Sequence, residues 1–158
     1  MADQTLLLML DDVRSKLLKR LEGVTAKQAR WKPQGLQNDI LWHAGHPIMV
    51  VERLTLGALN MPEQIPDGWF EMFGWESKPA EIEASRWPAL DVVVQELRNQ
   101  KTRIQQLISN LSEAQLDQPA ANKPEQTVRF RIMHALHDEA CHSGEIWLLR
   151  KMMKQAGV

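Results

Sequence analysis

Histidines and the acidic residues beside them are the side chains of this sequence best suited to chemistry. The chain has five histidines, and one of them, His142, follows Asp138 by four residues. Residues four apart lie on the same face of a helix. In a helix over residues 126–155, that face adjoins the apolar stripe of Ile132, Ala135, Ile146 and Leu149. We therefore expect Asp138 and His142 to face the interior, whereas His134 lies near the opposite edge of the stripe and His137 points away.

Two further histidines lie earlier in the chain, on a second predicted helix. His43 falls on the apolar stripe of that helix, and His46 falls nearer its flank. Helical bundles build metal sites from side chains on facing helices. The sequence therefore predicts a metal site formed by His43, Asp138 and His142. His46 is the alternative ligand on the second helix, and Glu139 is the alternative acidic ligand.

The chemistry of this trio favours a divalent cation. A carboxylate and two imidazoles buried without partners would each cost roughly several kcal/mol, and a bound cation removes that cost. Imidazole and carboxylate ligands suit zinc first, and also nickel, iron or manganese. Three protein ligands leave coordination positions open for water or substrate. The competing interpretation is a hydrogen-bonded core trio in which Asp138 only orients a histidine.

Other residues near the trio have predicted supporting roles. Cys141 adjoins His142, and we expect a buried, inert thiol there because a reactive one needs a nearby base and partial exposure. Glu145 is placed to orient one of the metal ligands, or to accept a hydrogen bond from His142. Aromatic residues between the second and third helices either close over the metal or anchor the connection, and anchoring is the preferred interpretation: Trp69, Phe70, Phe73 and Trp75.

Four long helices must position these residues. Apolar residues at steps of three and four predict helices over residues 3–23, 37–60, 88–111 and 126–155. Pro47 lies inside the second, so this helix either kinks there or breaks at Gly45 and restarts. Residues 61–88 form a long, aromatic-rich connection with a short helix near 68–73. No strand pattern appears, and the sequence predicts an all-α four-helix bundle.

Two short segments share one capping pattern. Thr25 with Gln28 has the spacing of a capping box. Val24-Thr25 followed by Gln28 and Pro33 resembles Leu111-Ser112 followed by Gln115 and Pro119. Each pair follows one long helix and precedes another. This weak internal repetition indicates a bundle organised in two halves.

Length, composition and charge limit the classes of protein. At 158 residues the chain has the usual size of one domain, so we expect a single domain over residues 1–158. The net charge is −1, with 19 basic and 20 acidic residues, which argues against nucleic acid as a partner. One cysteine, no visible secretory signal and no apolar stretch of membrane-spanning length predict a cytoplasmic protein.

Two motifs resemble a known family. The segments 40–46 and 137–150 are similar to motifs of the DinB/YfiT-like superfamily, and helix order and length agree over essentially the whole chain. The resemblance implies a four-helix bundle with a metal triad, one ligand on the second helix and two, four residues apart, on the last. Carried over, the triad is His43, Asp138 and His142. Most relatives have histidine where this chain has Asp138, although the mycothiol-dependent maleylpyruvate isomerase branch uses an acidic residue there with zinc.

The resemblance also implies partners and activities. Members are frequently homodimers, and some branches are transferases that use bacillithiol or mycothiol. We therefore expect a metal-binding homodimer acting as a metal-dependent thiol (S-)transferase with a low-molecular-weight thiol, or as a hydrolase of a small molecule. The alternative is a non-catalytic dimeric bundle that binds a metal or another ligand. No general base beyond the metal ligands is predicted.

Overall fold

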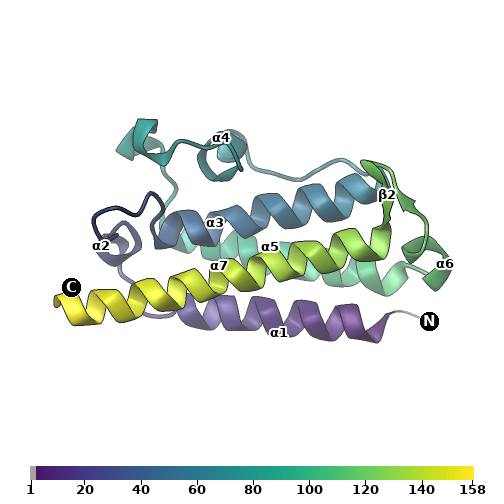
Figure 1. The fold of residues 1–158 in the computed structure, drawn as a ribbon, viewed down its shortest axis with the longest axis horizontal. Helices are drawn as coiled ribbons and strands as arrows, with labels where there is room; N and C mark the ends of the chain where they lie inside the picture. Colours follow the sequence, from purple (N-terminus) through teal and green to yellow (C-terminus); the bar gives the residue numbers. More distant parts are fainter. Residues whose placement is uncertain (1–2) are drawn as a thin grey trace.

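Four long helices packed side by side make up most of the molecule (Figure 1). The structure, a computed structural model, describes residues 3–158. The long helices are α1 (Gln4–Leu21), α3 (Ile40–Val51), α5 (Leu90–Asn110) and α7 (Val128–Ala156). Each begins within three residues of its predicted start. The predicted all-α four-helix bundle is confirmed.

The long connection between α3 and α5 allows these two consecutive helices to run in the same direction. α1 and α7 run in one direction, and α3 and α5 run in the other (Figure 1). Because α3 and α5 are parallel, residues 60–89 must cross back along the length of the bundle. This crossover carries α4 (Trp69–Phe73) and two 3-10 turns, η3 (Pro79–Glu81) and η4 (Ala84–Arg86). The predicted long connection and its short helix are confirmed.

Side-chain caps fix where the helices begin. Asp3, Asp39 and Thr127 each accept a hydrogen bond from the backbone N–H three residues later, at the starts of α1, α3 and α7. The predicted capping box of Thr25 and Gln28 opens α2 (Ala26–Ala29), and the repeated pattern of Ser112 and Gln115 is a second capping box that opens α6 (Glu113–Leu116). In α3 the capped first turn leads directly to His43.

α3 is continuous through Pro47. The α-helix runs over all twelve residues from Ile40 to Val51, so the restart at Gly45 considered above does not occur. A π-helical turn, η1 (Glu52–Leu56), and a 3-10 turn, η2 (Gly57–Leu59), extend it to Asn60, where a φ of 54° ends the helix. All residues of α3 are buried, so this helix has no solvent-facing side.

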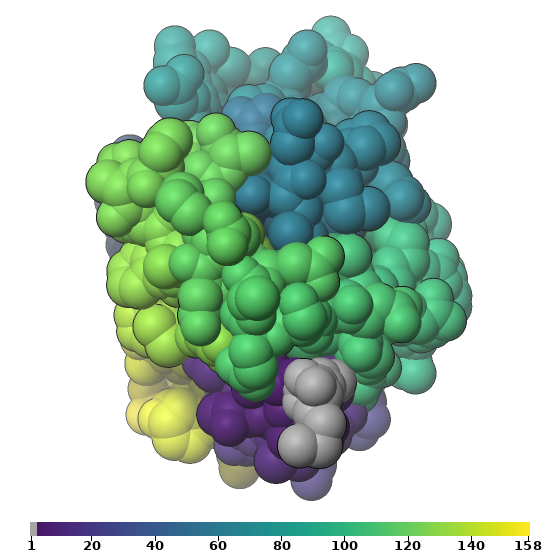
Figure 2. All heavy atoms as spheres, turned by 90° about the vertical axis from the view of Figure 1, so that its right-hand side faces the viewer, coloured from purple at the N-terminus to yellow at the C-terminus, as the bar shows by residue number. Residues whose placement is uncertain are grey.

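The prediction of no strands is wrong for one short segment. β1 (Pro119–Ala120) and β2 (Lys123–Thr127) pair antiparallel between α6 and α7. Most side chains of β2 are exposed and none follows an apolar alternation, so the sequence carries no strand signal. Figure 2 shows this end of the bundle, where the hairpin and its neighbours lie between α1 and the C-terminal extension of α3. The Ala121 N–H donates to the Ala58 carbonyl at 2.9 Å and fastens the hairpin there.

A buried polar layer divides the apolar core into two clusters. On three helices a fully buried polar residue separates them: Arg14 on α1, Gln100 on α5 and Glu139 on α7. Arg14 Nε lies 2.5 Å from Glu139 Oε1, and Arg14 Nη2 donates to Gln100 Oε1 at 2.8 Å. Gln100 Nε2 donates in turn to Glu52 Oε1 at 3.0 Å, on the extension of α3. The layer therefore joins all four sides of the bundle.

The longest helix, α7, has 29 residues and carries charged side chains along its exposed side. Within the described part of the chain, no helix is both long and apolar enough to cross a membrane. The single domain over residues 1–158 stays a prediction.

Candidate metal centre

Two histidines of α3 lie beneath the crossover. His43 and His46 are almost fully buried, at 8% and 4% exposed. The ring of Trp42 stacks on His46 with centroids 4.5 Å apart and meets His43 edge-on at 5.3 Å. The Trp42 indole N–H donates to Ser77 Oγ of the crossover at 2.9 Å, which fixes the indole. Both imidazoles are therefore held in place by their neighbours.

One hydrogen bond determines the tautomer of His46. Its Nδ1 lies 2.5 Å from the backbone carbonyl of Phe73 in α4, and a carbonyl can only accept. Nδ1 therefore carries the ring proton and donates it. Burial lowers the pKa of His46, so the ring is neutral near pH 7. Nε2 is left with a free lone pair, which is the form in which imidazole binds a metal ion.

Asp138 and His142 of α7 face this lone pair. Asp138 Oδ2 lies 3.9 Å from His46 Nε2 and 3.5 Å from His142 Nε2. One potential ligand atom from each of the three side chains lies within 4.8 Å of the other two. The side chains of Asp138 and His142 are 29% and 18% exposed, so solvent reaches the cluster from the α7 side.

His43 contacts His142 on the side of the ring opposite to the Nε2 atom that faces Asp138. The Nδ1 atoms of the two rings lie 2.9 Å apart, a hydrogen bond that needs one protonated and one bare nitrogen. Burial lowers the pKa of His43 to about 3 and that of His142 to about 4, and repulsion from neighbouring histidines adds to both shifts. Both rings are neutral at pH 7. The predicted trio is thus brought together, with His43 in contact with His142 rather than with the carboxylate.

The residues of this cluster fit a divalent cation. Although the Asp138 side chain is partly exposed, its Oδ2 atom is buried and has no hydrogen-bond donor among residues 3–158. That oxygen faces the bare Nε2 of His46, so two acceptors lie opposite one another. Such an arrangement is unfavourable without positive charge between the acceptors. A carboxylate oxygen and two imidazole nitrogens are also a donor set that zinc, nickel, iron and manganese accept.

Most of this bundle matches a known family. The sequence profile of the DinB superfamily matches residues 9–146, from the middle of α1 to beyond His142. The chain belongs to the DinB superfamily. A crystal structure of a conserved protein from Enterococcus faecalis has the same fold, with a TM-score of 0.74, 96% of each chain covered and 18% sequence identity. At that identity the likeness concerns the fold alone. No curated protein matches the chain.

This DinB chain uses the adjacent acids Asp138 and Glu139 differently. Glu139 points toward α1, where its carboxylate accepts from Arg14 Nε at 2.5 Å and from Nη2 at 2.8 Å. Both side chains are fully buried. Glu139 is therefore occupied by an ion pair, which leaves Asp138 as the acid that faces the histidines. Glu145 is exposed and has no hydrogen-bond partner within the described residues, so it is not placed to orient a ligand.

Cys141 lies outside the cluster. The prediction of a buried thiol is wrong, because Cys141 is exposed. Its Sγ lies 4.0 Å from Nε2 of His137, one helical turn earlier. Successive residues are about 100° apart around a helix, and this rotation carries Cys141 from the side of His142 onto the outer surface of α7.

The aromatic residues of the crossover form two pairs. Trp69 and Phe73 are buried and anchor α4 on the core, as preferred from the sequence. Phe70 and Trp75 are 38% and 48% exposed. Trp75 nevertheless meets the ring of His46 edge-on, with centroids 5.8 Å apart. Both roles considered above are therefore present, because Trp75 partly covers the cluster while the buried pair anchors the segment.

The absence of a side chain at Gly45 lets α4 approach α3. A Cβ at Gly45 would lie 2.3 Å from a ring carbon of Phe73, closer than side-chain carbons pack. Phe73 is fully buried, and its carbonyl orients His46. We expect Gly45→Ala to displace α4, to lower the free energy of unfolding by about 1–3 kcal/mol, and to weaken zinc binding about 10–100-fold.

Thermal melting and zinc titration of this variant measure both effects. Gly144→Ala is the matched control, because a Cβ there meets no atom within 4 Å. Equal zinc affinity in the two variants would show that the position of α4 does not determine the orientation of His46.

Proposed function

We propose that this protein holds one divalent metal ion between α3 and α7, with His46, Asp138 and His142 as its ligands. The observation that carries the proposal is the buried, unpartnered Oδ2 of Asp138 facing the Nε2 atoms of two neutral histidines. Zinc is the first candidate for the ion, followed by nickel, iron or manganese. His43, the ligand predicted on this helix from the sequence, is in this proposal the hydrogen-bond partner of His142.

The neighbours of the two ligand histidines support their proposed orientation. With His142 Nε2 directed at the ion, its Nδ1 carries the ring proton and donates to His43 Nδ1. His46 Nδ1 donates to the Phe73 carbonyl in the same manner. Metal-binding histidines usually donate their second ring N–H to such a partner, which fixes the tautomer and the ring orientation. The chain therefore supplies the ligands and also the groups that orient them.

We further propose that the open side of the site serves small-molecule chemistry. When bound, a divalent ion with three protein ligands lowers the pKa of a thiol or water that reaches it. The partial exposure of Asp138 and His142 gives access, and Trp75 offers an apolar surface at the rim. A thiol (S-)transferase that uses a low-molecular-weight thiol agrees best with the family resemblance. Hydrolysis of a small molecule would use the same open side.

A second candidate is a metal-binding DinB protein without turnover. It is favoured because, among residues 3–158, the cluster offers no free general base. His43, which contacts the proposed ligands, is already hydrogen-bonded to His142. The homodimer inferred from the resemblance also stays a prediction, and sedimentation would measure it.

Metal content of the purified, untagged protein tests the metal proposal. We expect about one equivalent of a divalent ion, and a lower melting temperature after chelation because an ion that binds only the folded state stabilises it. A metal-free protein that takes up none of the four candidate ions would contradict the proposal. Loaded and metal-free protein are then compared in thiol-transfer and hydrolysis assays. Turnover by the loaded form alone supports the enzyme, and equal background rates support the second candidate.

A further inference from the structure

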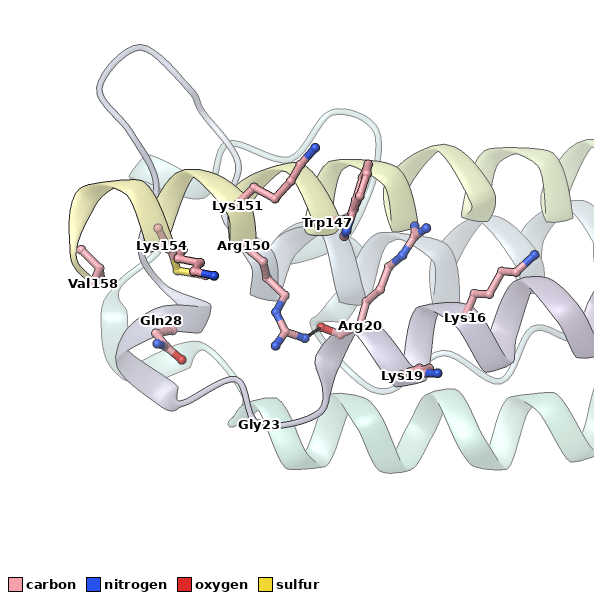
Figure 3. Close-up of a pocket in the computed structure, with 11 residues that line it drawn as sticks. Lys16, Lys19, Arg20, Gly23, Gln28, Trp147, Arg150, Lys151, Lys154 and Val158 are labelled. Atoms are coloured by element: carbon pink, nitrogen blue, oxygen red, sulfur yellow. Dashed lines mark hydrogen bonds between the residues drawn. The ribbon is translucent and has the colours of Figure 1, made fainter.

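A basic groove lies on a different side of α7 from the metal centre. α1, α7 and the segment after α1 border an open groove of about 740 Å³ near the C-terminal ends of the two helices, within the size range of roughly 300–1,000 Å³ that holds small ligands. Trp147 in its wall follows His142 by five residues, which places it about 140° away around the helix. Within the described part of the chain, no acidic side chain lines the groove, and six cationic side chains do (Figure 3): Lys16, Lys19, Arg20, Arg150, Lys151 and Lys154.

Most of the cations of this groove have no ion-pair partner among the described residues. Lys16 pairs with Asp12 at 2.6 Å, but the other five cations have no carboxylate within ion-pair distance among residues 3–158. α1 and α7 are parallel, so both of their C-terminal ends lie nearby (Figure 1). A helix end carries only about half a negative charge, and two such ends do not balance five cations. The net charge of −1 shows that the excess is local.

Neutral partners hold several of these cations in place. Arg150 Nη1 donates to the Arg20 carbonyl at 2.5 Å (Figure 3). Arg20 Nη1 donates to Ser143 Oγ at 2.6 Å. Lys151 Nζ lies 3.6 Å from the centre of the Trp147 ring. These contacts orient the side chains without neutralising them, so their remaining N–H donors are free. Holding like charges together costs free energy that a bound anion would recover.

We propose that this groove binds an oligophosphate, a linear chain of two or more phosphate groups that is either free or carried by a nucleotide. Residues 16–20 and 150–154 each span about 6 Å of helix, so the cations form two short rows on facing helices. Arginine donates forked pairs of hydrogen bonds to phosphate, and lysine adds a point charge. An extended polyanion contacts both rows, whereas a single phosphate contacts part of one. The rows are too short for the basic stripe that a nucleic-acid duplex needs.

Calorimetric titration of the full-length, metal-free protein with inorganic triphosphate tests this proposal, because removing the metal excludes chelation as a source of heat. We expect one site, and about tenfold weaker binding in the variant Lys151→Gln/Lys154→Gln. Both lysines are exposed, so their replacement does not disturb the core. Arg98→Gln/Lys123→Gln removes one exposed and one half-buried charge away from the groove and is expected to bind as the parent does. His46→Ala is expected to bind normally, because the metal centre is separate.

Further ligands distinguish the source of the phosphate chain. Equal affinity for triphosphate and ATP supports a free oligophosphate, and tighter binding of ATP than of triphosphate supports a nucleotide. The proposal is overturned if neither binds at millimolar concentration, or if the control pair loses as much affinity as the groove pair. Binding to anionic lipid vesicles without binding of triphosphate would also overturn it and assign the groove to a membrane surface.

Discussion

Replacing Glu139 by glutamine is expected to lower the free energy of unfolding by about 3–5 kcal/mol, because it breaks a buried ion pair and leaves one charge behind. The carboxylate accepts two hydrogen bonds from Arg14, and both side chains are fully buried. In Glu139→Gln the guanidinium keeps its bonds to the Leu97 carbonyl and to Gln100 but has no negative partner. Urea unfolding measures the loss as a lower midpoint at an unchanged slope.

Two comparisons isolate the ion pair from a general effect of substitution. Glu145→Gln, on the exposed side of the same helix, is expected to change stability by less than about 0.5 kcal/mol. The double variant Arg14→Met/Glu139→Leu removes both charges and is expected to recover much of the loss. Equal midpoints for Glu139→Gln and Glu145→Gln would mean that the pair contributes nothing. Folded Glu139→Gln should still bind zinc, because this carboxylate does not face the histidines.

The second large expected effect is a difference in metal affinity between variants of the two histidines of α3. His46→Ala is expected to abolish retention of the metal ion through dialysis, because it removes one of the three proposed ligands. His43→Ala is expected to weaken binding about 10–100-fold, which is the usual effect of losing a partner that only orients a ligand. Competition with a chromophoric chelator measures both affinities, and Asp138→Asn should behave like His46→Ala.

The reverse order would identify His43 as the ligand. If His43→Ala loses the ion while His46→Ala keeps it, the set His43, Asp138 and His142 predicted from the sequence is correct and our proposed set is wrong. Circular dichroism of each variant keeps this comparison independent of folding, since a variant that retains the helical spectrum has lost the ion for local reasons.

Spacing in the sequence predicts that Asp138 and His142 lie together, and the structure has both in one cluster. Which histidine of α3 completes the site stays a prediction. α7 has one buried side and one exposed side, so spacing alone places Asp138 and His142 toward α3. α3 is buried on every side because the crossover covers it, and a helical wheel cannot rank His43 against His46 on such a helix. The group that orients His46 is the carbonyl of Phe73, in a segment without helical periodicity. Residues 40–51 are almost all apolar, and this was the signal in the sequence that the helix has no solvent-exposed side.

The separation of Asp138 from Glu139 depends on a contact distant in sequence. Both acids are within helical reach of His142, and local spacing does not distinguish them. The two acids are distinguished by Arg14, which pairs with Glu139 and is 125 positions from it in the chain. A charged residue on the apolar stripe of the first helix, between Leu10 and Leu17, needs a buried partner, and in this sense the sequence contained a clue. The hairpin had no comparable signal, since its strands are short and exposed.

The polar layer also determines the axial register of the bundle. Apolar surfaces pack without directional bonds, so four helices joined by core leucines and isoleucines alone could slide past one another by a helical turn, about 5.4 Å. Hydrogen bonds from Arg14 to Glu139 and from Gln100 to Glu52 are lost in any such displaced alignment. Because Glu139 adjoins Asp138, and Gln100 also donates to the Ile48 carbonyl two residues beyond His46, these bonds fix the height at which α7 meets α3. The two halves of the candidate metal centre are thus aligned by residues outside the proposed ligand set.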